Sequence, residues 1–289
     1  MERTNLALKT NLDFKIETSR PIALRNRGSV HGPIVRLVSP GDIGERIKPF
    51  VFLDRFDVPP SDNADVEAAL VNRYHPHSGI MTVTALLSGE LVYEDTTGRQ
   101  GVLPTGGIEY MQAGGGVWHT GCAIGSENAK GFQLWVALPP ALENAKATST
   151  YLLRSEVPTE GPVRVILGSY GKAHSRIFPT LPMTYLHVSL KDGEGWRYQP
   201  PVDHDVAWVA VQQGELRTGG FTLDKEIAVF EEGDQAIEFV ARGKTDFVLG
   251  SAITHPHPLV LGYYSVHTSE ESLKAGESEI KRIGRRVRS

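Results

Sequence analysis

The strongest constraint on the fold of this chain is a pattern of short apolar runs that are separated by glycine-containing turns. Residues 82–87 (TVTALL) alternate in polarity, and Gly89 separates them from a second run at residues 90–95 (ELVYED). Alternation with a period of two is typical of β-strands, and a glycine between two such runs favours a tight turn. We therefore expect a β-hairpin in this region.

The same pattern returns in the second half of the chain. ALLSGEL at residues 85–91 corresponds to VAVQQGEL at residues 209–216, and a further glycine turn and strand follow each copy. Helix-forming sequence is scarce before residues 269–287. A repeated strand unit indicates a duplicated domain. We predict an all-β protein of two tandem barrels, residues 1–142 and 143–289, with a short C-terminal helical segment.

Composition and charge exclude several classes of partner and site. The 289 residues carry a net charge of −4, so no overall positive field attracts nucleic acid or anionic lipid. Cys122 is the single cysteine, which excludes an internal disulfide and a multi-cysteine zinc site and fits a reducing compartment. We find no apolar core of a signal peptide and no membrane-spanning segment in the sequence. We expect a soluble, cytoplasmic protein.

Three histidines have a spacing that suits a metal site. His75 and His77 lie two residues apart just before a predicted strand, so both imidazoles share a face. His119 follows the glycine run 114–116, where the backbone can approach a site closely. Imidazole binds divalent iron, nickel, copper, manganese and zinc. An isolated HxH pair is more often two ordinary histidines, so the interpretation depends on the order of the whole set.

Taken in order, these motifs resemble the signature of the pirin family, which belongs to the cupin superfamily. The resemblance lies in IKPFVFLDRFD (47–57), HPHSGIMTVTALLSGELVYEDTTG (75–98), IEYMQAGGGVWHT (108–120) and GFQLWVALP (131–139). It implies two tandem cupin barrels of the jelly-roll (double-stranded β-helix) type. It also implies one metal ion, often iron, in the N-terminal barrel, with the three histidines as ligands, and a metal-free C-terminal barrel.

One ligand position departs from the family pattern. Pirins carry a glutamate two residues after the last histidine, where this chain has Gly121. The site is then completed by water or substrate, is completed by a carboxylate from elsewhere, or binds no metal tightly. Glu109 and Glu94 are the candidate carboxylates, although we expect each to be a solvated strand residue. Cys122 is expected to be a small buried side chain rather than a thiolate ligand.

Four residues close to these motifs are candidates for supporting roles. Tyr74 and Gln133 are candidates for the hydrogen bonds that fix imidazole tautomers. Trp118 and Trp135 are expected to be core aromatic residues rather than platforms for a substrate.

Histidines of the second half do not fall at positions that match the first set. We expect His204 to be an ordinary polar residue and His255 and His257 to bind no metal, although they also form an HxH pair. The basic residues 281–289 are expected to be the favourable cationic end of a helix rather than a binding segment.

The resemblance implies two functions that the sequence leaves open. One is a metal-dependent dioxygenase that acts on a small aromatic substrate such as quercetin, with one divalent ion, iron favoured over nickel, copper, manganese or zinc. The other is a non-catalytic regulator that binds a protein partner, as a mammalian pirin does in transcription. The three histidines favour the enzyme, and Gly121 favours the regulator. No catalytic residue is assigned.

Overall fold

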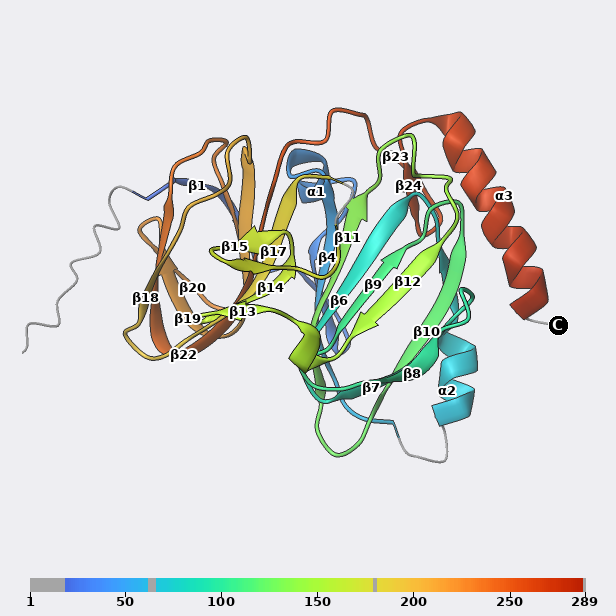
Figure 1. The fold of residues 1–289 in the computed structure, drawn as a ribbon, viewed down its shortest axis with the longest axis horizontal. Helices are drawn as coiled ribbons and strands as arrows, with labels where there is room; N and C mark the ends of the chain where they lie inside the picture. The colour runs from blue at the N-terminus through green and yellow to red at the C-terminus, as the bar shows by residue number, and fades with distance from the viewer. Residues whose placement is uncertain (1–18, 62–65, 179–180, 288–289) are drawn as a thin grey trace, which may run out of the picture.

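The computed structural model describes residues 19–61, 66–178 and 181–287, which form two β-barrels side by side with one long helix on the outer flank (Figure 1). The described strands pair antiparallel within their sheets. The predicted all-β architecture with a C-terminal helix is confirmed.

Two sheets form the first barrel. The larger one contains, in spatial order, β12 (Thr148–Leu152), β9 (Ile108–Gln112), β6 (Ile80–Ser88), β11 (Ala129–Ala137), β4 (Phe50–Val58), β3 (Ile34–Val38) and β2 (Ser29–His31). The smaller one contains β5 (His75–His77), β10 (Val117–Ile124), β7 (Glu90–Asp95) and β8 (Gln100–Leu103). Side chains from both sheets meet in one apolar cluster that includes Phe56, Leu86, Leu103 and Ala123. The two sheets therefore enclose a common interior.

The second barrel is one continuous nine-stranded system. Its main path is β1 (Ile22–Asn26), β21 (Ile227–Phe230), β19 (Val206–Thr218), β22 (Ile237–Ala252), β17 (Met183–Leu190), β14 (Val163–Leu167) and β13 (Thr159–Glu160). β18 (Gly195–Tyr198) pairs with β22, and β20 (Phe221–Leu223) pairs with β19. Trp196, Phe239 and Phe247 pack with their rings in contact inside this barrel.

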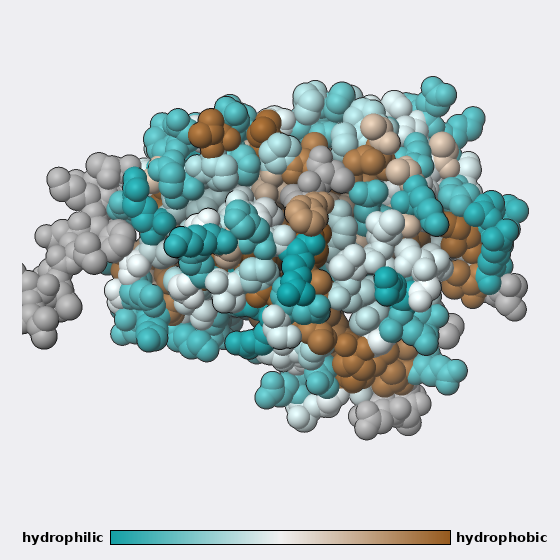
Figure 2. Space-filling view, in the orientation of Figure 1, coloured by the Kyte–Doolittle hydropathy of each residue, from teal (hydrophilic) through white to brown (hydrophobic). Residues whose placement is uncertain are grey.

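An apolar layer joins the barrels. It contains Met81 and Leu134 from the first barrel and Tyr185 and Trp208 from the second, and all four are buried. Phe50 contacts Trp208 edge to face, with 5.4 Å between the ring centroids. On the face shown in Figure 2, hydrophilic residues cover most of the surface and hydrophobic residues form smaller groups.

The expected hairpin around Gly89 is wrong, although both of its strands form. β6 pairs with β9 and β11, whereas β7 pairs with β8 and β10 in the other sheet. Gly89 has φ +75°, and a Cβ there would lie 2.7 Å from Cα of Ala129. The glycine is therefore the corner where the chain passes from one sheet to the other. The corresponding Gly214, φ +77°, is a corner inside the single long strand β19.

Segments from both ends of the chain lie on the barrel built mainly from the other half. β1 pairs with β21 of the second barrel. The C-terminal hairpin β23 (Val260–Gly262) and β24 (Ser265–His267), followed by α3 (Glu270–Val287), lies on the first barrel (Figure 1). α3 buries Leu273, Gly276, Ile280 and Gly284, a stripe with helical spacing. The other described elements are α1 (Ile43–Arg46), α2 (Val66–Arg73), a 3₁₀ turn (Arg154–Glu156), β15 (Ser169–Tyr170) and β16 (Ala173–His174).

Candidate metal centre

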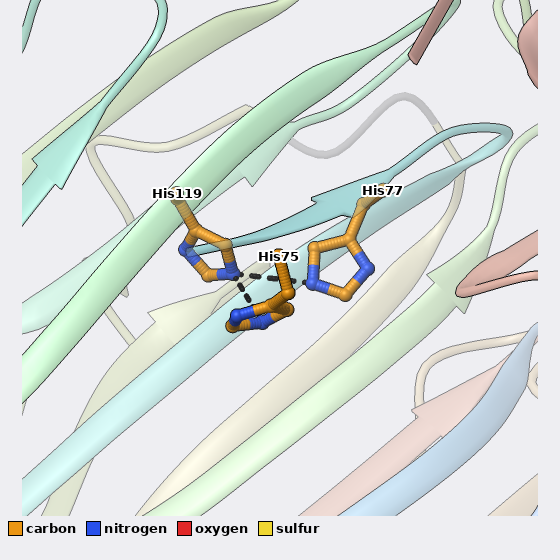
Figure 3. A group of neighbouring side chains, drawn as sticks. All are labelled: His75, His77 and His119. Carbon is orange, nitrogen blue, oxygen red and sulfur yellow. Dashed lines mark hydrogen bonds between the residues drawn. The ribbon is translucent and has the colours of Figure 1, made fainter. Parts of the chain in front are cut away.

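Two neighbouring strands of the smaller sheet, β5 at its edge and β10 beside it, bring the three predicted histidines together. β5 pairs with β10 so that His75 lies directly opposite His119, and His77 lies opposite Val117. Since His75 and His77 alternate with Pro76 on one strand, their imidazoles point to the same side as that of His119 (Figure 3). In the part of the chain that the structure describes, these three histidines form the group of metal-ligand side chains whose geometry suits a metal ion.

The Nε2 atoms of the cluster converge on a common point. Nε2 of His119 lies 3.0 Å from Nε2 of His75 and 3.1 Å from Nε2 of His77 (Figure 3). Two ligands held at right angles and about 2.1 Å from one ion would be about 3.0 Å apart. The ligand atoms of all three residues lie within 4.8 Å of one another. The spacing of these nitrogens therefore suits coordination of a single divalent ion.

Each Nδ1 atom has a partner on the outside of the cluster. His75 Nδ1 lies 2.8 Å from the carbonyl of Arg73, and His77 Nδ1 lies 3.2 Å from the carbonyl of Tyr264. His119 Nδ1 lies 3.1 Å from Oε1 of Glu109. Because these oxygens accept hydrogen bonds, they place the ring proton on Nδ1 and leave a lone pair on Nε2. The three Nε2 lone pairs face each other and repel, because none of these nitrogens carries a hydrogen to donate. A cation bound between them removes this repulsion.

Burial keeps the imidazoles of His75 and His77 neutral. Burial, and then the proximity of His119, lowers the pKa of His75 to about 4. Burial, and then the two other imidazoles, lowers the pKa of His77 well below its ordinary value. A metal ligand must present an unprotonated nitrogen, so this environment favours metal binding at neutral pH.

Glu109 is a buried partner of the site, so the expectation of a solvated strand residue is wrong. Its side chain bonds His119 and accepts a hydrogen bond from the hydroxyl of Thr84. Burial opposes ionisation of this carboxyl, but the bonds from His119 and Thr84 outweigh it and hold its pKa below the ordinary value. On β9, Ile108 and Tyr110 face the layer between the barrels, so Glu109 faces the barrel interior. A single acidic residue inside an apolar strand was the signal for this role.

Gln133 supports the cluster indirectly, through Thr84 and Glu109. As placed, Oε1 of its side-chain amide lies 2.7 Å from Oγ1 of Thr84, the residue that donates to Glu109, and the two ends of an amide are interchangeable by a half-turn. One hydroxyl hydrogen cannot serve two acceptors, so the consistent arrangement has Thr84 donating to Glu109 and accepting from the amide nitrogen of Gln133. Gln133 therefore contacts the carboxylate network rather than an imidazole.

The remaining candidates of the first barrel form no hydrogen bond with the ligand imidazoles. Tyr74 bonds the exposed Glu94, and burial, followed by this carboxylate, raises the pKa of the phenol to about 12. Cys122 is fully buried and its thiol contacts Ser61, which confirms the prediction of a small buried side chain. Trp135 stacks on Phe52 in the core.

The aromatic residues beside the histidines differ in their contacts with the cluster. The ring centroid of Trp135 is 4.8 Å from that of His77, so this core residue also forms one side of the site. Trp118 lies on the opposite face of β10, where its indole donates to the carbonyl of Ile280 in α3 at 2.7 Å. Tyr264 of the β23–β24 turn also contacts the cluster, and the sequence contains no signal for this contact because it joins residues 187 positions apart.

Gly121 leaves the fourth ligand position without a side chain. It lies two residues after His119 on β10 and therefore on the same face, opposite Tyr93 of β7. A Cβ at this position would have one neighbour within 4 Å, the carbonyl oxygen of Val92 at 3.7 Å. The backbone can therefore accept a larger residue here.

Histidines of the second half take no part in this cluster. His204 Nδ1 bonds the hydroxyl of Ser251 at 2.8 Å. His255 is buried beside His257, with 5.3 Å between the ring centroids. Neither joins a group of metal-ligand side chains in the described part of the chain. Among the described helices, none has the length and apolar character needed to cross a membrane.

Comparison with known proteins agrees with this architecture. The family model described as Pirin matches residues 34–136. A pirin-like protein of Caulobacter vibrioides is 32% identical over 72% of this chain and 77% of its own length. A Pseudomonas aeruginosa protein with the provisional name quercetin 2,3-dioxygenase is 33% identical over 80% of this chain and 85% of its own length.

A solved structure has the same fold. The crystal structure of quercetin 2,3-dioxygenase from Acinetobacter baumannii superimposes with a TM-score of 0.80 at 21% identity, over 91% of this chain and 97% of the other. This likeness extends over both barrels and the C-terminal helix. The fold, the three-histidine cluster and the relatives together place this chain in the pirin family of the cupin superfamily.

Proposed function

We propose that this chain is a metal-dependent dioxygenase that acts on quercetin-like aromatic substrates. The observation that carries the proposal is the convergence of three Nε2 atoms, each held as an acceptor by a partner at Nδ1. The provisional name of the Pseudomonas relative and the name of the Acinetobacter protein of the same fold support the substrate class.

The donor set favours a borderline transition metal. Three neutral imidazoles suit iron, nickel, copper, manganese or zinc, and iron is the metal that we favour for oxygen chemistry. Such an ion, when bound, supplies a Lewis acid with open positions for a substrate oxygen and for dioxygen. The histidines hold the ion, and Glu109 holds the proton on Nδ1 of His119.

Gly121 alters the charge of this site. Three neutral ligands leave the full charge of a divalent ion uncompensated, whereas a glutamate ligand would cancel part of it. The site should therefore prefer an anionic chelating ligand, such as the deprotonated hydroxyl and the adjacent carbonyl of a flavonol. The space beside Gly121 supports this preference, because no side chain at that position blocks a second substrate oxygen.

Gly121 also stands where the family glutamate would be the evident acceptor of a substrate proton. Two carboxylates beside the cluster already have partners: Glu109 bonds His119 and Thr84, and Asp95, which lies opposite His119 on β7, bonds Tyr151 and the backbone of Thr97. A missing general base typically costs a factor of about 10² to 10⁴ in rate. We therefore expect slow turnover, with the metal itself lowering the pKa of the substrate hydroxyl.

Oxygen uptake with quercetin tests the proposal. The protein is loaded in turn with Fe²⁺, Cu²⁺, Ni²⁺ and Mn²⁺, and we expect uptake above the buffer rate with at least one metal at high protein concentration. The double variant His75→Ala, His77→Ala should lose both metal and activity. His255→Ala, His257→Ala is the matched control, because it changes a second HxH pair outside the cluster.

The alternative function is a non-catalytic regulator that binds a protein partner. Gly121 in place of the family glutamate is the observation that favours it. If every metal-loaded form leaves oxygen uptake at the buffer rate and Gly121→Glu restores nothing, the dioxygenase proposal is abandoned for this one.

A further inference from the structure

The turn between β23 and β24 reaches the histidine cluster from the far end of the sequence. The carbonyl of Tyr264 in this turn accepts the hydrogen bond from Nδ1 of His77 at 3.2 Å. The next residues of each segment also meet, because Ser78 forms a β-bridge with Ser265 and their hydroxyls lie 2.8 Å apart. His77 is thus held by the pairing of its own strand, β5, with β10 on one side and by the C-terminal hairpin on the other.

Tyr264 adopts a backbone conformation that favours glycine. Its φ is +52°, in the left-handed region that side chains other than glycine, asparagine and aspartate rarely occupy. Contacts on both sides fix the turn: the backbone N–H of Tyr263 donates to Glu277 of α3 at 3.1 Å, and the hydroxyl of Ser265 donates to the carbonyl of Tyr263 at 2.9 Å. The left-handed conformation directs the Tyr264 carbonyl toward His77.

The ring of Tyr264 lies beside the same cluster. Its centroid is 5.6 Å from that of His75 and 5.9 Å from that of His77. Trp135 is 6.4 Å away. Tyr264 is 42% exposed, whereas His77 and Trp135 are buried. The ring therefore stands at the solvent side of the cluster.

We propose that the β23–β24 turn is part of the metal centre, with two separable roles for Tyr264. Its backbone carbonyl is a positioning group that fixes the metal-binding tautomer of His77. Its ring is the outer aromatic wall against which a flat oxygenated ligand stacks while it chelates the ion. This inference rests on the proposed function for the identity of the ligand, but the role of the carbonyl needs only a bound metal.

Substitutions at position 264 separate the two roles. Tyr264→Gly removes the ring but adopts the left-handed conformation without strain, so the carbonyl stays in place. Tyr264→Val also removes the ring, and its β-branched side chain disfavours that conformation, so the carbonyl should move. Tyr264→Phe keeps the ring and removes only the hydroxyl.

Metal affinity, measured by competition with a chelator for Zn²⁺, tests the carbonyl. Loss of such an outer partner typically weakens a metal site by about 10- to 100-fold. We expect that loss for Tyr264→Val, and affinities within about twofold of the parent protein for Tyr264→Gly and Tyr264→Phe. Equal affinities for the valine and glycine variants would overturn the positioning role.

A spectroscopic measurement covers the case in which the valine variant folds poorly. The ¹⁵N chemical shifts of the His77 ring in the metal-free parent and in Tyr264→Gly should both report a proton on Nδ1. A proton on Nε2 in either protein contradicts the role of the carbonyl, whatever the fate of Tyr264→Val.

Quercetin binding to the Zn²⁺-loaded protein, followed without oxygen by tryptophan fluorescence, tests the ring. Tyr264→Gly should weaken binding by about tenfold, the value of one aromatic stacking contact, and Tyr264→Phe should not. Unchanged binding to Tyr264→Gly would exclude the aromatic wall. Parent protein that binds Zn²⁺ but no quercetin would count against the proposed substrate class and against the wall, and would leave the carbonyl test intact.

Discussion

The hydrogen on Nδ1 of His119 points to the carboxylate of Glu109, 3.1 Å away, and Thr84 donates to the same carboxylate. This arrangement makes His119 a stronger donor toward a metal, because a partly negative partner at Nδ1 raises the basicity of Nε2. It also means that Glu109 is engaged in orienting His119 and is not the missing fourth ligand. A carboxylate can serve either role, but its hydrogen bonds decide which.

Replacing Glu109 by glutamine tests this role. The glutamine oxygen still accepts from Nδ1, but without negative charge, so we expect metal affinity to fall toward the lower end of the range of about 10- to 100-fold. Glu94→Gln, the same change at an exposed position of β7, should leave the affinity unchanged. Chelator competition gives both values, and equal effects of the two substitutions would contradict the orienting role of Glu109.

Gly121→Glu restores the ligand that the family pattern places here. The position shares a face with His119 and has room for a side chain, so we expect metal binding at least tenfold tighter than in the parent protein. Gly121→Gln is the matched control, because it fills the same space without a negative charge. If glutamate and glutamine give the same affinity, the residue at this position does not reach the ion.

The ligands were predictable from the sequence, but which partner meets which ligand was not. His75, His77 and His119 follow from strand periodicity and motif order, which are local in the chain. The partners Glu109 and Tyr264 become neighbours of these histidines only through strand pairing and through the return of the C-terminal hairpin. Long-range pairing is set by the tertiary fold, and one sequence carries little direct signal for it.

At the scale of elements, the corner at Gly89 shows that glycines with positive φ fall into two kinds, those whose Cβ position is blocked and those whose Cβ position is free. Gly89 and Gly98 both have positive φ, but a Cβ at Gly89 would meet the backbone of Asn128 and Ala129 at 2.7 Å, whereas one at Gly98 would meet no atom within 4 Å. The sequence predicted a turn at Gly89 correctly and its type wrongly, because apolar alternation marks strands and does not say which sheet each one joins.

Alanine substitution at these two glycines measures the difference. Gly98→Ala should cost only the backbone strain, about 1 to 2 kcal/mol of unfolding free energy. Gly89→Ala should cost more, about 3 kcal/mol or above, because the corner itself must shift. Urea unfolding of the metal-free proteins gives both numbers. A loss at Gly89 no greater than that at Gly98 would mean that the corner is free to relax.

At the scale of the whole molecule, buried neutral histidines connect stability to pH. Burial is the leading cause that lowers the pKa of His75 to about 4, and it also lowers the pKa values of His77, His187, His204, His255 and His267. In the unfolded chain a histidine takes up its proton near pH 6.5. Between that pH and about 4, the unfolded state therefore binds more protons than the folded state.

The metal-free protein should accordingly be most stable above about pH 6.5 and lose stability as the pH falls toward 4. Each buried histidine contributes up to about 1.4 kcal/mol per pH unit in this window.

His75→Asn removes one such group, so its unfolding free energy should fall less steeply between pH 7 and pH 5 than that of the parent protein. His174→Asn, at an exposed position, should leave the slope unchanged. Urea unfolding at the two pH values decides the matter: parallel slopes for the parent and His75→Asn would mean that this imidazole takes up its proton over the same pH range in the folded metal-free protein as in the unfolded chain. A divalent ion at one hundred times its dissociation constant should add about 2.7 kcal/mol at neutral pH.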